Sequence, residues 1–92
     1  MSILWSRDAL VDLERLHDFV ARVNPVAADS LLVALVSAPD RLLDHPRLGL
    51  RLDQFAPDDV RRLIVGNYEI RYQVEEAGIS ILRVFHGKED RN

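Results

Sequence analysis

The stretch "VRRLIVGNYEIRYQV", residues 60 to 74, decides the fold because the hydrophobic pattern takes a period of two there. In its second half polar residues alternate with apolar or aromatic ones, namely Tyr68, Ile70, Tyr72 and Val74. This alternation is typical of a strand in a sheet that is buried on one face. With "ISILRVF" after it, the sequence predicts a meander of three strands at 60–65, 68–74 and 79–85, joined by turns at "GN" and "EEAG".

The residues before this stretch follow a helical period. The apolar "ILW" at 3–5 predicts an opening strand, and Ser6 is the expected N-cap of a helix of about 17 residues. Three- and four-residue spacing predicts which side chains form its buried stripe, and places Asp12 outside that stripe. The predicted stripe consists of Ala9, Leu13, Leu16, Val20 and Val23, widened by Leu10 and Phe19.

A second helix is expected directly after the first. Asn24 can cap it and Pro25 suits its first turn, where a missing N–H is tolerated. Its apolar pattern continues to Leu43, but Pro39 removes a helical hydrogen bond and predicts a kink or break. Residues 44–59 contain two prolines and a glycine and are expected to form a loop.

The element order predicts an α+β fold for residues 1–92 as a single domain. It is a two-layer β-α-α-β-β-β arrangement in which an antiparallel helical hairpin packs on one face of a small, mainly antiparallel sheet. The aromatic residues expected in the core or at its edge are Trp5, Phe19, Phe55 and Phe85. In so small a domain, one side of the hairpin is expected to stay partly exposed for a partner.

Composition excludes several classes of function. The chain of 92 residues has no cysteine, and its histidines, His17, His45 and His86, are scattered, so neither a metal site nor a cofactor is expected. No apolar run approaches the roughly 20 residues that span a bilayer, so we expect a cytoplasmic protein without membrane contact. The net charge of −3 argues against direct, specific DNA binding by the chain alone.

Arginines on the predicted strands are the first candidates for function. Arg61 or Arg62, Arg71 and Arg83 can present their guanidinium groups on the open face of the sheet or along its edge. Clustered guanidinium groups recognise phosphates and carboxylates through paired N–H donors. The alternative is that each arginine forms an ordinary surface ion pair, with Glu69, Glu75 or Asp90 as the available carboxylates.

The stretch "ILRVFHGKED" at 81–90 holds the remaining candidates. His86, at the end of the last strand, is either a general acid or base or a residue that closes the strand end with a backbone hydrogen bond. Lys88 and Arg91, among acidic neighbours, form a charged tail that either binds a target or is only solvated.

The ordered set of segments resembles one known family over residues 3 to 91. These segments are "ALVDLERLHDFV", "NPVAADSLL", "HPRLG", "VRRLIVGNYEIRYQV" and "ILRVFHGKEDR". Together they resemble a toxin of the RelE/ParE superfamily from bacterial type II toxin-antitoxin modules. The resemblance implies the β-α-α-β-β-β fold and two possible activities: ribosome-dependent mRNA cleavage in RelE-like members and DNA gyrase poisoning in ParE-like members.

Three departures favour the ParE-like branch. Glu69 follows Tyr68 where RelE-like enzymes usually have an arginine, the C-terminal tyrosine is absent, and the loop before the strands lacks lysines. The resemblance therefore implies a gyrase inhibitor with no catalytic residues, neutralised by an antitoxin that wraps its surface. The residues expected to bind the target or the antitoxin are Arg61, Arg62, Arg71, Arg83, His86, Lys88 and Arg91.

Two alternatives remain at this stage. The first is a RelE-like endonuclease that acts on mRNA at the ribosome with Arg62, Arg83 and His86 as catalytic residues. The second is a catalytically inert module, a degenerate toxin that is retained for antitoxin binding and autoregulation.

Overall fold

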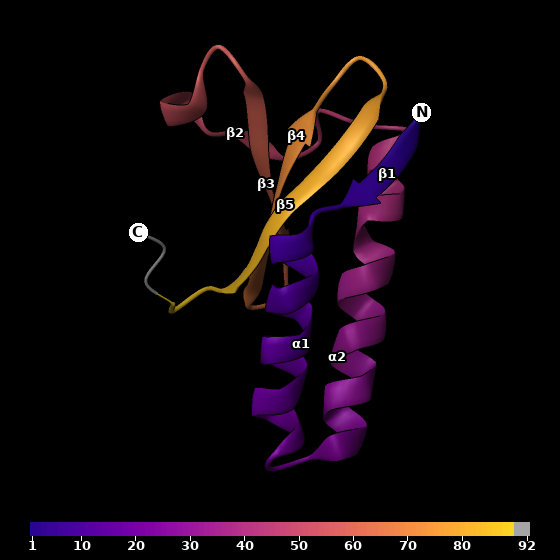
Figure 1. Cartoon of the computed structure of the whole chain (residues 1–92), viewed down its shortest axis with the longest axis vertical. Helices are drawn as coiled ribbons and strands as arrows, with labels where there is room; N and C mark the ends of the chain where they lie inside the picture. The colour runs from indigo at the N-terminus through magenta and orange to yellow at the C-terminus, as the bar shows by residue number, and fades with distance from the viewer. Residues whose placement is uncertain (90–92) are drawn as a thin grey trace.

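A helical hairpin packs on a five-stranded sheet in the computed structural model, which describes residues 1–89 (Figure 1). The chain forms β1 (Ser2–Trp5), α1 (Arg7–Ala21), α2 (Pro25–Ser37), β2 (Leu50–Arg51), β3 (Asp59–Val65), β4 (Tyr68–Val74) and β5 (Gly78–His86). Two short 3-10 helices, η1 (Ala38–Leu43) and η2 (Asp53–Phe55), interrupt the connections. The predicted α+β class and element order are confirmed.

The sheet has the strand order β1-β5-β4-β3-β2. The three predicted strands pair antiparallel, and β1 joins the edge of β5 in parallel because the helical hairpin returns the chain to the far side of the sheet. The segment 44–59, predicted as a loop, also contains β2, which pairs Leu50 with Arg62 and Arg51 with Arg61. That expectation was incomplete, because a strand of two residues leaves no period to detect.

The helix ends follow the predicted capping chemistry. The Ser6 hydroxyl accepts a hydrogen bond from the Ala9 N–H at 3.0 Å, and the Asn24 side chain accepts one from the Ala27 N–H at 3.1 Å. The second helix ends at Ser37, and the backbone tightens into η1 around the buried Pro39. This confirms the predicted break, since proline cannot donate the next helical hydrogen bond.

The core lies between the hairpin and one face of the sheet. Its fully buried members on the sheet include Ile70, Tyr72, Ile81 and Val84, and the helices contribute Ala9, Leu13, Leu16 and Leu35. Phe85 is also buried but pairs with Glu69 across β5 and β4, so it lies outside this cluster. No helix in residues 1–89 is long and apolar enough to cross a membrane.

The predicted stripe of α1 needs correction at both ends. Leu10, Phe19 and Val23 are exposed, by 53%, 69% and 90%, although they were expected to face the core. Figure 1 shows that the end of the hairpin where α1 meets α2 projects beyond the sheet, and Val23 lies in that connection. Asp12, expected outside the stripe, is only 2% exposed.

Candidate functional site

Asp12 of α1 closes the unpaired edge of β5. The strand β1 covers that edge only from Gly78 to Ile81, and α1 then runs along the rest (Figure 1). The Asp12 carboxylate accepts hydrogen bonds from the Val84 N–H at 2.9 Å and from Arg83 Nε at 2.7 Å. It also lies 3.3 Å from Arg15 Nη2. One carboxylate thus joins the helix, the strand and two guanidinium groups.

The ionisation of Asp12 follows from these contacts. Burial alone would raise the pKa of its carboxyl group, but the hydrogen bonds from Arg83, the Val84 N–H and Arg15 outweigh burial and lower that pKa. The same contact with Asp12 raises the pKa of Arg83. Arg83 is therefore held at α1 as a charged partner of Asp12.

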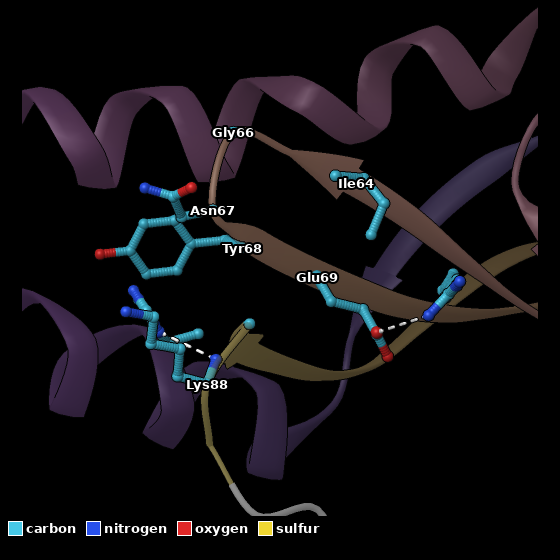
Figure 2. Close-up of a pocket in the computed structure, with 9 residues that line it drawn as sticks. Ile64, Gly66, Asn67, Tyr68, Glu69 and Lys88 are labelled. Atoms are coloured by element: carbon cyan, nitrogen blue, oxygen red, sulfur yellow. Dashed lines mark hydrogen bonds and ion pairs between the residues drawn. The ribbon is translucent and has the colours of Figure 1, made fainter.

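A second buried carboxylate, Glu69, lies on the opposite face of the sheet. It is 2% exposed and makes ion pairs with Arg71 at 3.3 Å and Arg62 at 3.7 Å. The dashed line from Glu69 in Figure 2 marks the pair with Arg62. Two of the arginines predicted on the strands, Arg62 and Arg71, therefore pair with Glu69. An ordinary ion pair with Glu69 is what the alternative interpretation of these arginines predicted.

Aromatic rings also contact the guanidinium groups of two strand arginines, Arg71 and Arg83. The Arg71 guanidinium lies 5.3 Å from the ring centre of Phe55 and 5.2 Å from that of Phe85, and Arg83 lies 4.9 Å from Phe85. These separations are in the range of cation–π attraction. Phe55, on η2, is therefore at the edge of the open face, and Arg71 is packed with its side chain only 16% exposed.

A cavity of about 440 Å³ opens beside Glu69, and we name it the turn pocket. Figure 2 shows Tyr68 and Lys88 at one end and Ile64 and Glu69 at the other. Its lining consists of Arg62, Ile64, Gly66, Asn67, Tyr68, Glu69, His86, Gly87 and Lys88.

The orientation of His86 is fixed by two contacts within the turn pocket. Its Nδ1 accepts a hydrogen bond from the Lys88 N–H at 3.1 Å, and its ring stands edge-on to Tyr68 with centroids 5.1 Å apart. The hydrogen bond from the Lys88 N–H to the His86 ring is the kind of contact that we expected of a residue that closes the end of a strand.

The predicted site residues are therefore divided among three places. Arg62, His86 and Lys88 line the turn pocket, and Arg71 adjoins it through Glu69. Arg83 is bound to Asp12 at the sheet edge. Arg61 belongs to neither place, since it bonds to Asp59 at 2.8 Å and to the Gly49 carbonyl at 2.9 Å.

One predicted residue lies outside the described part of the chain, and two important ones were missed. Arg91 falls within residues 90–92, which the structure does not describe. Asp12 and Arg15 were not predicted. A signal for Asp12 existed, because it is three residues after Ala9 and four before Leu16, which is a position on the apolar stripe itself.

Within residues 1–89 no group of acidic, histidine or cysteine side chains is arranged to hold a metal ion. What the described site offers chemically is a set of guanidinium groups, most already paired with carboxylates, and one histidine beside an open pocket. Such an arrangement suits recognition of a partner surface.

Comparison with known proteins agrees with this fold. The family model described as "ParE toxin of type II toxin-antitoxin system, parDE" matches residues 3–91. Toxin RelE2 of Caulobacter vibrioides is 32% identical over 85 residues, which cover 91% of this chain and 92% of that protein. A solved structure described as the chromosomal ParDE TA system from P. aeruginosa superposes with a TM-score of 0.79 at 25% identity, over 94% of this chain and 95% of that one. The chain therefore belongs to the ParE toxin family, within the RelE/ParE superfamily, and is the toxin of a type II toxin-antitoxin system.

Proposed function

We propose that this toxin acts by binding and inhibiting DNA gyrase, and that its cognate antitoxin neutralises it. The observation that carries the proposal is the buried carboxylate of Glu69 in the turn pocket. A ribonuclease needs cationic groups that are available to a scissile phosphate, whereas Arg62 and Arg71 are paired with Glu69. The negative charge of Glu69 would also repel that phosphate.

The positions of the three candidate catalytic residues also support binding over cleavage. Arg62 and His86 share the turn pocket, but Arg83 is bound to Asp12 at the sheet edge and does not line it. The family model that matches nearly the whole chain is that of ParE toxins. Gyrase inhibition requires no proton-transfer set, and so it is consistent with this arrangement.

A supercoiling assay with purified gyrase tests the proposal. Added toxin is expected to inhibit ATP-dependent supercoiling and to leave cleaved plasmid after protein denaturation. Pre-mixing the toxin with its antitoxin should abolish both effects, which is the control for specific action. Normal supercoiling with an excess of folded toxin would refute the proposal.

The second candidate is a ribosome-dependent mRNA endonuclease, and one observation favours it. Arg62, His86 and Lys88 line a single open cavity, which brings cations together with an imidazole, the side chain most often used in general acid–base catalysis. In a translating extract, this candidate predicts site-specific mRNA cleavage that His86→Gln abolishes. Normal growth after strong induction without antitoxin, together with two negative assays, would instead identify an inert antitoxin-binding module.

A further inference from the structure

A second cavity, of about 530 Å³, lies between the C-terminal half of α1 and the ends of β4 and β5. We name it the α1 groove. Leu16, Phe19, Val20 and Tyr68 form its apolar walls, and Arg15 and Lys88 contribute positive charge. Phe19 is 69% exposed although it is one of the largest apolar side chains of the molecule, so this wall is available to a partner.

The charges around the α1 groove are opposite to those of the chain as a whole. The chain carries a net charge of −3, yet Arg15 and Lys88 line the groove and Arg22 lies 6.0 Å from the Phe19 ring centre. Glu89 is the one carboxylate that lines it among residues 1–89. An apolar hollow with a cationic rim is complementary to an acidic segment that carries an apolar anchor side chain.

Glu89 shows how a carboxylate binds at this rim. It makes an ion pair with Arg15 and accepts a hydrogen bond from the His86 N–H at 3.0 Å. Two further contacts hold the Arg15 guanidinium, since its Nη2 lies 3.3 Å from Asp12 and 3.5 Å from the Val84 carbonyl. The guanidinium is therefore held in place independently of Glu89.

Exchange of that carboxylate is energetically easy. The side chains of Arg15 and Glu89 are 43% and 29% exposed. Ion pairs so accessible to solvent are weak, because water screens both charges and the two side chains lose entropy when they pair. A carboxylate supplied by a partner can thus replace Glu89 on Arg15 when it, or water, also accepts the hydrogen bond of the His86 N–H.

We propose that the α1 groove is the docking site for an acidic segment of the antitoxin, and that Glu89 is an internal competitor for it. In the complex, an apolar antitoxin side chain fills the hollow beside Leu16, Phe19 and Tyr68. An antitoxin carboxylate takes the place of Glu89 on Arg15, and Lys88 adds a second attractive charge. This assignment rests on the family membership of the chain and is independent of gyrase as the target.

Binding measurements with the full-length toxin and the purified full-length antitoxin of the same module test the proposal. Phe19→Ser is expected to weaken binding about tenfold or more, since it removes the apolar wall of the hollow. Lys88→Glu should weaken it by about threefold or more at low salt. Glu89→Gln should tighten it, and this gain should disappear when Arg15 is also changed to alanine.

The matched control is Val33→Ser, which changes an apolar side chain of α2 that is 66% exposed and does not line the groove. It should leave the affinity within about twofold of wild type, as expected for a surface residue outside the contact. Thermal melts of all variants exclude unfolding as the cause of weak binding, and Lys88→Glu, an exposed change, provides the test if Phe19→Ser fails to fold. Wild-type affinity in either folded groove variant, or an equal loss in Val33→Ser, would overturn the proposal.

Discussion

Asp12 illustrates how one residue joins two layers of this protein. Its carboxylate satisfies the Val84 N–H, which has no strand to pair with, and binds Arg83 and Arg15. A buried donor without a partner costs as much as a lost hydrogen bond or more. The carboxylate also occupies a strand edge that would otherwise be open to pairing with another chain.

Replacing Asp12 should therefore be costly. Asp12→Ala leaves the buried Val84 N–H unsatisfied and removes the shared partner of two guanidinium groups, so we expect a loss of about 2–3 kcal/mol in the free energy of unfolding. Urea denaturation checks this value. Glu14→Ala, an exposed change on the same helix, is the control and should alter stability by less than about 0.5 kcal/mol. Equal stability of the two variants would contradict the role of Asp12.

At the scale of elements, the connection 44–52 is fastened by a side chain of β4. The Tyr72 hydroxyl accepts a hydrogen bond from the Gly49 N–H at 2.8 Å and donates one to the Pro46 carbonyl at 2.9 Å. A Cβ at Gly49 would lie 2.5 Å from the Arg62 carbonyl and 2.7 Å from that hydroxyl, so only glycine fits there. The two hydrogen bonds of the Tyr72 hydroxyl therefore position β2 against β3.

Tyr72→Phe should release this connection. The change leaves two backbone groups without their partner in a buried place, and we expect it to cost about 1–3 kcal/mol of stability. Denaturation and amide exchange of Gly49 provide the measurements. Tyr68→Phe removes a hydroxyl that has no hydrogen bond among residues 1–89, and it should be much milder. If both variants lose the same stability, the hydroxyl of Tyr72 does not have this role.

The two helices are also joined by a pH-sensitive contact. His17 Nε2 lies 2.8 Å from Asp29 on α2, and its Nδ1 lies 3.4 Å from Asp18. The hydrogen bond with Asp29, helped by the one with Asp18, raises the pKa of His17. Because the folded-state pKa is raised, the contact stabilises the fold fully below about pH 6.5, the unfolded value, and this contribution is lost as the pH rises through the raised pKa.

Asp29→Asn should lower the pKa of His17 back toward its ordinary value. An NMR titration of the His17 ring measures this change directly. Asp40→Asn, an exposed substitution beyond the far end of α2, is the matched control and should leave the titration unchanged. An unaltered His17 pKa in Asp29→Asn would show that the contact does not form in solution.

At the scale of the whole molecule, a small core supports a large exposed apolar surface. The exposed apolar residues of the two helices and their connection are Leu10, Val11, Phe19, Val23, Val26, Val33 and Val36. The hairpin therefore stays partly exposed, as we expected from the sequence. Phe19 is the member of this set that lines the α1 groove, where we propose that the antitoxin docks.

Antitoxin binding should accordingly stabilise the toxin. A hundredfold excess of antitoxin over its Kd is expected to raise the free energy of unfolding by about 2.7 kcal/mol. For a domain of this size, that corresponds to a rise in Tm of roughly 10 °C or more. Differential scanning fluorimetry measures it, with a non-cognate antitoxin as the control. An unchanged Tm under conditions where the complex forms would contradict a shared, folded interface.

The sequence by itself determined what depends on local periodicity and backbone chemistry. The alternation in 60–74 gave the strands, the spacing from Ala9 to Leu16 gave the first helix, and Ser6, Asn24 and Pro39 gave the helix ends. These signals act between residues a few positions apart, so they can be read along the chain. The resemblance to the toxin family also drew attention to Glu69, because it follows Tyr68 where RelE-like enzymes usually have an arginine.

Only the tertiary structure decided which charges meet and which apolar residues remain exposed. Asp12 is buried because β1 ends before β5 does, and Val23 is exposed because the closed end of the hairpin extends past the sheet. Arg83 lies on a strand but bonds to a helix 71 positions earlier in the chain. Such pairings depend on where elements end relative to one another in space, and no local pattern records that distance.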